Sequence, residues 1–404
     1  MKNLFIVFIA IMSFAGCQSG KESMHDLIAD RLARSAEQYA LMAASLRDQP
    51  DKLPRSTDAA GNLITSGPNW WCSGYFPGSL WYLYEYSDNE KVLEDARHYT
   101  ARVEAVKNDR SQHDIGLMLY CSFGNGYRLT GDTAYRDVLL TGAESLSSRF
   151  NPKVGCIQSW NENKERGWQY PVIIDNMMCL ELLLWASKES GDPKYGNQCI
   201  SHAEVTIRNH FRPDYSSYHV VSYDTITGQA DKKNTHQGFS DDSAWARGQA
   251  WGLYGYTMMY RETHKPEFLE QATHIAAFLL NHPHLPADKI PYWDFNAPDI
   301  PASRRDASSA AIMASALVEL SGYVDEKSAQ TYLEVAQTQI RTLSSAEYFA
   351  ETGTNGYFIL KHSVGHLPAN SEVDVPLTYA DYYYIEALTR YQKLLDKNTL
   401  KQPF

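Results

Sequence analysis

A repeated alternation of polar loops and helix-stopping turns constrains the fold of this chain more than any other feature of its sequence. A loop rich in polar residues is followed, 14 to 16 residues later, by a residue that ends a helix. The loop and turn positions are Gly74 and Asp88, Ile115 and Gly131, Asp175 and Gly191, Gly248 and His264, and Ala307 and Tyr323, with a sixth loop around Tyr379 at the same distance from Leu395. A helix of that length is about 24 Å long, so each loop lies at one end of a helix and each turn at the other. The six loops should therefore share one face of the molecule.

The turns follow a common plan that joins antiparallel helices. In 127–135, 186–195 and 260–268, a small or polar stop precedes an N-cap residue or a Pro at the first helical position, and an aromatic residue follows. This self-similarity predicts a repeat of helical hairpins. The turns are unevenly spaced along the chain, so the loops opposite them must vary in length.

The predicted helices are of two kinds. Residues 116–130 and 308–321 follow loops and carry one charged residue each, whereas residues 91–107 follow a turn and carry seven. A helix that is apolar all round is buried on every side, and a helix with a charged stripe faces water. The helices after the loops should therefore form an inner layer and those after the turns an outer one.

An amphipathic helix over residues 22–46 completes six outer and six inner helices. Twelve alternating helices with buried inner members favour an all-α fold, the (α/α)6 barrel; an open helical solenoid is the alternative. Strand signals are few, and 219–223 and 356–360 are expected to form short hairpin strands in the loops. Because no Pro-, Gly- or Ser-rich linker divides the repeat, residues 25–395 are predicted to be a single catalytic domain.

The N-terminus has the pattern of a bacterial lipoprotein signal. A basic residue precedes an apolar run over 4–14 and small residues before Cys17, although Phe14 stands where such signals usually carry Leu. The run is too short to span a membrane. We expect residues 1–17 to direct export, Cys17 to become a lipidated N-terminus and 18–24 to be a tether, in the periplasm or cell envelope of a Gram-negative bacterium. An ordinary cleaved signal or a buried N-terminal helix is the alternative.

Charge and cysteine content exclude several classes of function. The net charge is -11, which would repel an acidic polymer, and there is no basic stretch of the kind found in nucleic-acid-binding proteins. The five cysteines after Cys17 are odd in number and lack CxxC spacing. Without an HxxxH motif or a carboxylate-rich cluster, no metal and no cofactor are predicted. An anionic ligand would have to be held by a few local cations.

The six loops are rich in aromatic, carboxylate and amide side chains. Aromatic faces stack on sugar rings while amides and carboxylates bind hydroxyls, so the mixture predicts a carbohydrate site. Asp114 and Asp175 each stand at the head of an inner helix, and a simple helix cap is the alternative for each. Apolar residues surround Asp175 in the sequence, and such a setting raises a carboxyl pKa toward that of a general acid. We therefore expect one carboxyl to stay ionised and the other to stay acidic.

Other candidate residues lie in the same loops. Arg247 stands in an otherwise charge-poor stretch and is predicted to bind a carboxylate; a structural pair with the acidic residues 241–242 is the alternative. His113 is expected to orient a substrate hydroxyl or to tune Asp114, unless it is structural. The candidate stacking platforms are Trp70, Trp71, Trp160 and Trp168.

The loops contain four ordered motifs: His113-Asp114-Ile-Gly, Asp175-Asn-Met-Met, Gln237 followed by SDDSAWARGQAWG over 240–252, and Ser371-Glu-Val-Asp-Val-Pro-Leu. Through these motifs the chain resembles the unsaturated glucuronyl hydrolases of glycoside hydrolase family 88 over most of residues 25–392. The SAWARGQAWG run is highly specific. The 61 residues between Asp114 and Asp175 also fit the family's two functional aspartates.

The resemblance implies an (α/α)6 barrel that removes a terminal 4,5-unsaturated uronic acid from oligosaccharides released by a polysaccharide lyase. It implies that Asp175 is the general acid and base and that Asp114 assists by binding ring hydroxyls. The substrate contacts that it implies are Trp71, His113, Trp160, His219, Gln237, Arg247 and Trp251, with Arg247 and Gln237 near the uronate carboxylate. The implied partner is thus an unsaturated oligosaccharide, with no nucleic acid and no membrane contact beyond the lipid anchor.

Two alternative functions remain open at this point. The related unsaturated rhamnogalacturonyl hydrolases share the barrel and the chemistry but act on pectin-derived substrates. A non-catalytic glycan-binding lipoprotein would use the same aromatic mouth as a receptor. The apolar surroundings of Asp175 favour an enzyme, because a binding protein gains nothing from a carboxyl with a raised pKa.

Overall fold

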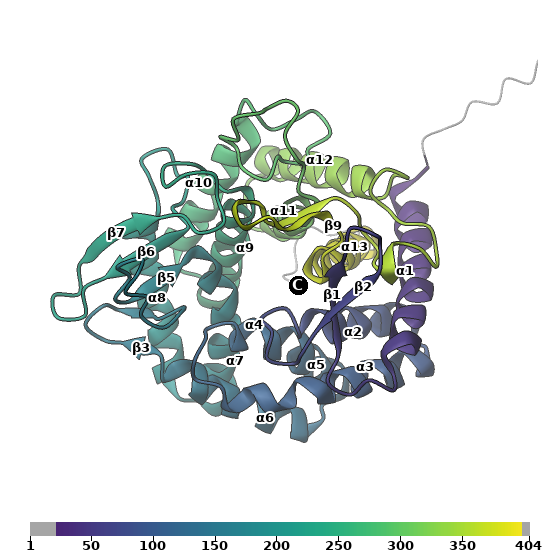
Figure 1. The fold of residues 1–404 in the computed structure, drawn as a ribbon, viewed down its shortest axis with the longest axis horizontal. Coiled ribbons are helices and arrows are strands. Elements are labelled where there is room, and N and C mark those ends of the chain that lie inside the picture. The colour runs from purple at the N-terminus through teal and green to yellow at the C-terminus, as the bar shows by residue number, and fades with distance from the viewer. Residues whose placement is uncertain (1–21, 398–404) are drawn as a thin grey trace, which may run out of the picture.

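The computed structural model describes residues 22–397, and within this range twelve helical rods form two concentric rings (Figure 1). The outer ring consists of α1 (Met24–Leu46), α3 (Glu90–Val103), α6 (Thr133–Ser147), α8 (Pro193–His210), α10 (Pro266–Asn281) and α12 (Glu326–Leu343). The inner ring consists of α2 (Tyr75–Ser87), a rod from α4 (Ile115–Leu119) to α5 (Asn125–Thr130), α7 (Leu180–Ser190), α9 (Ala246–Thr263), α11 (Ala307–Leu320) and α13 (Thr378–Lys397). Outer and inner rods alternate along the chain, which confirms the predicted (α/α)6 barrel.

Two inner rods depart from regular α-helix, one in its middle and one at the end that carries the loops. A π-helical turn, η2 (Tyr120–Gly124), joins α4 to α5, and a 3-10 segment, η3 (Ile174–Cys179), precedes α7. Such irregular turns are common at functional sites. These are the two rods that carry the candidate aspartates.

The two rings differ in burial as their charge predicted. Every residue of α11 is buried, whereas α3 buries a stripe that includes Ala96, Tyr99 and Val103. A helix enclosed by neighbours needs an apolar surface all round, and one at the rim needs a single apolar stripe. The distribution of charge along the sequence therefore determined which helices became the inner ring.

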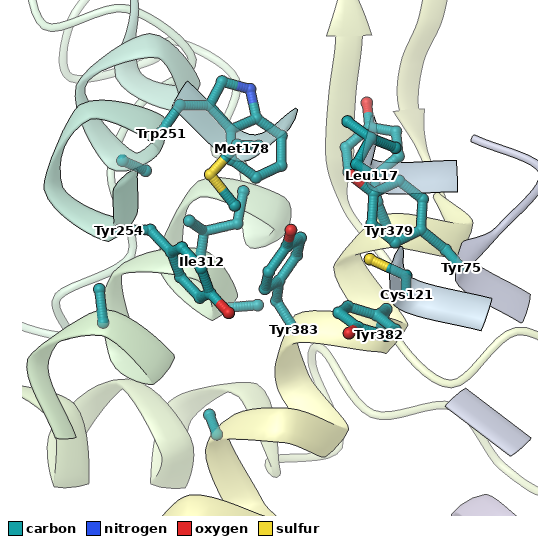
Figure 2. Packing of buried hydrophobic residues seen from close by; sticks show 14 of the residues in the cluster. Tyr75, Leu117, Cys121, Met178, Trp251, Tyr254, Ile312, Tyr379, Tyr382 and Tyr383 are labelled. Carbon is teal, nitrogen blue, oxygen red and sulfur yellow. The ribbon is translucent and has the colours of Figure 1, made fainter. Parts of the chain in front are cut away.

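Aromatic side chains of the inner helices fill the middle of the barrel (Figure 2). The ring of Tyr383 lies against Trp251 and Tyr254, with centroids 5.4 and 5.3 Å away, and Tyr75 lies 5.2 Å from Tyr382. All three contacts are tilted or edge-on, which is the favoured geometry for aromatic pairs. This layer separates the loop end of the barrel from the turn end.

The predicted helix-stopping turns are confirmed at four positions. The residue after each helix adopts the left-handed conformation, and its N–H donates to the carbonyl four residues earlier. These residues are Asp88, Gly131, Gly191 and His264, with φ of 48°, 66°, 73° and 53°. The reversal places the next outer helix antiparallel to the inner one, as the repeat predicted.

The strands all lie at the loop end within residues 22–397, in the segments that lead from an outer helix to the next inner one. They are β1 (Leu53–Thr57), β2 (Leu63–Ser66), β3 (Phe150–Asn151), β4 (Cys156–Ile157), β5 (Pro171–Ile173), β6 (Val220–Tyr223), β7 (Ala230–Asn234), β8 (Ser363–His366) and β9 (Ser371–Val375). They form three two-stranded hairpins, β1-β2, β3-β4 and β8-β9, and one three-stranded sheet in the order β5-β6-β7.

The sequence located one of two predicted strands. The strand expected over 219–223 is β6, but the strand expected over 356–360 is wrong. Gly356 and Tyr357 have φ of 58° and 68°, and left-handed residues form a turn instead of an extended strand. The hairpin in this connection lies further along, at β8 and β9.

The predicted lipoprotein signal over 1–17 lies outside the described residues, as do residues 18–21 of the expected tether. The first described helix, α1, begins at Met24. None of the helices within residues 22–397 combines the length and the apolar character that crossing a bilayer requires.

Candidate active site

A cavity of about 310 Å³ opens at the loop end of the barrel. Its walls are Arg55, Trp70, Trp71, His113, Asp114, Trp160, Ile173, Asp175, His236, Gln237, Arg247, Gly365, His366, Ser371, Glu372 and Tyr379. The structure thus brings together seven of the nine predicted site residues: Trp71, His113, Asp114, Trp160, Asp175, Gln237 and Arg247. His219 and Trp251 are buried beside the cavity instead of lining it.

Asp175 is delivered to the cavity by the strand that precedes it. β5 pairs with β6, with Ile173 opposite Val220, and η3 begins directly afterwards. Burial raises the pKa of Asp175 to about 6, while the positive charge of Arg247 acts in the opposite direction. The expected acidic carboxyl is therefore present, and apolar neighbours such as Ile173 help to bury it.

His219 faces Asp175 because the same strand pairing brings the two together. Its Nδ1 accepts hydrogen bonds from the backbone N–H groups of His236 and Gln237, both at 3.1 Å. The neutral imidazole must then carry its proton on Nε2, and Nε2 lies 3.6 Å from Asp175 Oδ2. Burial holds the pKa of His219 well below its usual value. A neutral ring thus directs an N–H toward the carboxyl.

Asp114 immediately precedes α4, and its carboxyl is more strongly perturbed than that of Asp175. Burial, followed by the nearby charge of Asp175, raises the pKa of Asp114 to about 7. Both carboxyls therefore keep their protons to a higher pH than free aspartates do, and because the charge of Asp175 raises the pKa of Asp114, Asp114 keeps its proton to the higher pH of the two. Neither carboxyl accepts a capping hydrogen bond from its helix, so the alternative of simple helix caps is wrong.

His113 lies under Asp114. Its Nε2 is 3.5 Å from Asp114 Oδ1, and its Nδ1 is 3.5 Å from the sulfur of Cys179. Burial lowers the pKa of His113 to about 3, so the ring is neutral at physiological pH. His113 lies against Asp114 as expected. Because His113 is buried, a sugar would be contacted by Asp114 beside it.

Arg247 is a buried cation in the cavity wall, with 1% of its surface exposed. Its Nη1 and Nη2 donate to the backbone carbonyls of Val364 and Gly365 in β8. The alternative pairing with residues 241–242 is wrong, because the carboxylate near the guanidinium is that of Asp306, 3.6 Å from Nη1. Gln237, from the loop between β7 and α9, binds the same strand β8, because its Nε2 also donates to Gly365 O, at 3.1 Å.

Tryptophans form opposite sides of the cavity. Trp160 is stacked on Trp168, with centroids 5.9 Å apart and planes at 28°, and Trp71 lies against Tyr379 at 4.9 Å. Trp70 is 40% exposed at the mouth. Both Trp70 and Trp71 therefore line the cavity. The indole of Trp70 lies at the mouth, and that of Trp71 lies further in, against Tyr379.

Trp251 is placed differently from what the family resemblance implied. Its indole is 1% exposed and packs on Tyr383 in the aromatic layer (Figure 2). The nearby indole N–H lowers the pKa of Asp175, against the effect of burial, although the two groups do not form a hydrogen bond in this structure. Trp251 thus acts on the carboxyl from within the protein, because α9 packs against η3 at this point.

Sequence analysis missed the walls that come from the hairpins. β1 contributes Arg55 and β9 contributes Glu372, which form an ion pair of 2.6 Å, and the Arg55 guanidinium lies 4.1 Å from the centre of a Trp70 ring. His366 comes from β8, and its Nε2–H donates to the backbone carbonyl of His236, 2.8 Å away. Glu372 belongs to the Ser371–Leu377 motif, but it was not singled out there. Arg55 and His366 follow no motif, and only the pairing of strands within the hairpins brings them to the cavity.

Several buried polar atoms around the cavity lack hydrogen-bond partners within residues 22–397. They include Asp175 Oδ2, His219 Nε2, His113 Nε2, Trp251 Nε1 and Tyr379 Oη. Buried polar groups are nearly always paired in proteins, and exceptions gather where a ligand or water binds. Their concentration here marks the cavity as a binding site for a polar molecule.

One group of potential metal ligands occurs in the part of the chain that the structure describes. His113, Asp114 and Cys179 place ligand atoms within 4.8 Å of one another. Burial raises the pKa of the Cys179 thiol well above its usual value, whereas metals bind the thiolate. Together with the raised pKa of Asp114, this favours protonated side chains, which are poor metal ligands.

Comparison with known proteins agrees with this geometry. The family model for Glycosyl Hydrolase Family 88 matches residues 48–394. An unsaturated glucuronyl hydrolase from Formosa agariphila is 46% identical over 349 residues, which are 86% of each chain. An unsaturated chondroitin disaccharide hydrolase from Streptococcus agalactiae is 33% identical over 80% of this chain and 81% of that protein.

A solved structure extends the comparison to three dimensions. The crystal structure of an unsaturated glucuronyl hydrolase specific for heparin superposes with a TM-score of 0.89 at 49% identity, covering 93% of this chain and 100% of that one. The protein is therefore a glycosidase, and its chain belongs to glycoside hydrolase family 88.

Proposed function

We propose that this protein removes a terminal 4,5-unsaturated glucuronic acid from oligosaccharides that a polysaccharide lyase has released. The observation that carries the proposal is the presence, in one cavity, of Asp175 with a pKa near 6 and of the buried Arg247 guanidinium. An acid and a fixed cation are what the protonation of an alkene that bears a carboxylate requires. The names of the relatives described above support glycosaminoglycan disaccharides as substrates.

The C4=C5 bond of such a sugar is part of a vinyl ether, because the ring oxygen is attached to C5. Transfer of the Asp175 proton to C4 creates an oxocarbenium-like centre at C5. The Asp175 carboxylate then accepts a proton from the water that attacks C5, and the acid is regenerated. The hydrated product is a hemiketal, which opens and expels the neighbouring sugar. A single carboxyl acts as acid and then as base, unlike the carboxylate pair of ordinary glycosidases.

The remaining site residues have roles that follow from their positions. Arg247 and Gln237 bind the uronate carboxylate, and Asp114 binds ring hydroxyls beside the reacting carbon. Trp71 and Trp160 stack on the sugars. His219 and Trp251 direct N–H groups at Asp175 from the buried side, where they stabilise its ionised form after proton transfer. His113 supports Asp114 in the same way.

The assignment of Asp175 is tested by an Asp175→Asn variant and the ultraviolet absorbance of the conjugated alkene. We expect the rate of absorbance loss to fall about a thousandfold, because general acid catalysis contributes about 10²–10⁴ in rate. Asp381→Asn is the control, since Asp381 is a buried carboxyl that binds the backbone N–H groups of Ile359 and Leu360 and does not line the cavity. A near-normal rate in Asp175→Asn would assign the acid to another residue.

Substrate class is tested by comparing rates on unsaturated disaccharides from heparin, chondroitin, ulvan and rhamnogalacturonan. We expect a glycosaminoglycan disaccharide to react fastest. A faster reaction with the rhamnogalacturonan product would instead support the rhamnogalacturonyl hydrolase alternative. Binding of these products without loss of the alkene would support a receptor.

We further propose that Cys17 is lipidated and anchors the protein in the cell envelope of a Gram-negative bacterium. Support comes from the apolar run over 4–14 that ends in small residues before this cysteine. Labelled palmitate should enter the natural protein and sediment with membranes, whereas Cys17→Ser should take up none. A natural protein that incorporates no label would favour an ordinary cleaved signal.

A further inference from the structure

Asp306 stands behind Arg247, and no motif or family likeness singled it out. It caps α11 and is fully buried. The N-cap aspartates of outer helices are less buried: Asp132 is half-buried and Asp192 is exposed, and each binds an amide of its own helix. Full burial of a carboxylate is costly unless it is compensated by several donors or a cation. The surroundings of Asp306 supply both.

The donors around Asp306 come from two segments of the chain. Within its own helix, Ser308 donates through its N–H at 3.1 Å and its hydroxyl at 2.7 Å, and the Ser309 hydroxyl donates at 2.5 Å. From β8, the N–H of Val364 donates at 3.2 Å. The carboxylate therefore ties the start of α11 to the hairpin that forms one wall of the cavity.

Arg247 closes this arrangement from a third segment, α9. Its Nη1 lies 3.6 Å from Asp306 Oδ2, and it donates to Val364 O. The peptide groups of Val364 are thus held from both sides, at the N–H by Asp306 and at the carbonyl by Arg247. At 3.6 Å, Asp306 attracts the guanidinium without a direct hydrogen bond, so N–H donors remain for a ligand.

We propose that Asp306 is a positioning residue for the carboxylate-binding arginine. It holds the Arg247 guanidinium and the Val364–Gly365 segment in one geometry, with the guanidinium toward the cavity. Its negative charge also compensates the buried cation before the substrate arrives. Asp306 does not touch the substrate, and its effect on binding is transmitted through Arg247.

A double-mutant cycle separates this role from a general contribution to folding. The four proteins are the natural one, Asp306→Asn, Arg247→Ala and the double variant, and the readout is KM for an unsaturated glucuronyl disaccharide. We expect Asp306→Asn to raise KM on the order of tenfold in the natural background and less than about twofold when Arg247 is already Ala. The same factor in both backgrounds, or no change in the natural one, would overturn the proposal.

Two further variants keep the test decisive if Asp306→Asn folds poorly. Ser309→Ala removes one donor from Asp306 Oδ2 and should raise KM in the same direction by a smaller factor; an unchanged KM would contradict the proposal. Asp381→Asn is the matched buried control, and its KM should not change even if its melting temperature falls. If KM rises as much in this control as in Asp306→Asn, the increase is a general effect of altering a buried carboxyl, and the proposal is wrong.

The experiment rests on the proposed function, since it uses an unsaturated uronate as ligand, and the cycle distinguishes the two failures. If Arg247→Ala leaves KM unchanged, the carboxylate site itself is misplaced. If Arg247→Ala raises KM while Asp306→Asn does not, only the role of Asp306 is wrong.

Discussion

Burial raises the pKa of both cavity aspartates, but their neighbours differ. The guanidinium of Arg247 opposes the shift at Asp175, whereas the charge of Asp175 adds to the shift at Asp114. The result is a pKa of about 6 for the proposed acid and about 7 for its neighbour. Near neutral pH, the protonated fraction of both aspartates therefore falls as pH rises. The rate of the reaction should fall with it.

We predict that kcat/KM decreases as pH rises through about 6, because the proposed mechanism needs Asp175 protonated. Replacing Arg247 by Met removes a positive charge that favours the carboxylate. The pKa of Asp175 should then rise, and the decrease in kcat/KM should move to higher pH. The measurement is the pH profile of kcat/KM for the natural protein and for Arg247→Met.

The control for this prediction is Arg304→Met. Arg304 is exposed at the loop end and pairs with Asp374 at 2.8 Å, so its loss tests whether any nearby cation shifts the profile. We expect its profile to match the natural one. Movement of the Arg247→Met profile to lower pH would show that the charge of Arg247 does not act on Asp175 as inferred.

The two aspartates also show what could be predicted about the site. The acidity of Asp175 could be anticipated because the apolar residues that help to bury it are its sequence neighbours, such as Ile173 and Ile174. The acidity of Asp114 could not, since it depends on burial and on a charge 61 residues away. The same holds for Asp306, whose partners Arg247 and Val364 lie on other elements. Motifs identified the reacting groups, and folding determined which of them share a charge environment.

Among the elements, α4 and η3 carry the two aspartates and approach each other at a glycine. A Cβ placed on Gly116 would lie 2.6 Å from both Cβ and O of Cys179. These distances are far below van der Waals contact, and the carbonyl belongs to the backbone. Gly116 therefore sets the separation between the segment that carries Asp114 and the segment that carries Asp175.

We predict that Gly116→Ala separates these segments and lowers both activity and stability. Overpacking at such a contact typically destabilises a protein by about 1–3 kcal/mol, and a displacement of about 1 Å can reduce a rate about a hundredfold. The measurements are kcat/KM from loss of the alkene and the melting temperature. The matched control is Gly252→Ala in α9, where the nearest atoms would lie at an ordinary 3.5 Å. Equal effects in both variants would contradict this role of Gly116.

The hairpins mark the limit of sequence-based prediction at this scale. Helices were recognised from charge distribution and stops, which are local signals. The hairpin of β8 and β9 was missed because His362, Asn370, Glu372 and Asp374 adopt left-handed φ between 50° and 61°, and these residue types are not specific for such a conformation. Sparsely populated backbone conformations are often concentrated at functional sites, and here they bring Glu372 to the cavity.

Over the whole molecule, polar contacts at the turn end join every neighbouring pair of inner helices into a closed circuit. The contacts are Arg128–Glu85, Tyr127–Glu189, Arg261–Glu181, Arg261–Glu319, Arg390–Glu319 and Lys393–Glu85. The loop end is held by hairpins that vary in length. Polar and ionic contacts therefore hold the inner helices together at the turn end, whereas the hairpins at the loop end form the walls of the cavity.

We predict that Arg261→Met destabilises the barrel by about 3 kcal/mol, because it leaves the buried Glu319 and the half-buried Glu181 without their shared partner. Activity of the folded protein should be unchanged, since the aromatic layer separates this circuit from the cavity. Urea unfolding and kcat/KM measure the two effects. Lys194→Met, which breaks an exposed pair with Glu144 in the outer ring, should destabilise by less than about 1 kcal/mol. A loss in Arg261→Met no larger than in this control would contradict the importance of the circuit.

The position of α13 between α11 and α2 has a consequence for how the chain matures. This helix carries Tyr379 into the cavity wall, and its Asp381 accepts a hydrogen bond from Tyr39 of α1, 342 residues earlier. During N- to C-terminal synthesis, α13 is made only after more than half of the barrel, so α1 and α2 lack this neighbour until then. Until then an apolar seam between α2 and α11 faces solvent, and the wall that includes Tyr379 is missing. The nascent protein is consequently most vulnerable to aggregation just before its last inner helix appears, and catalytic competence arrives in one step with ring closure.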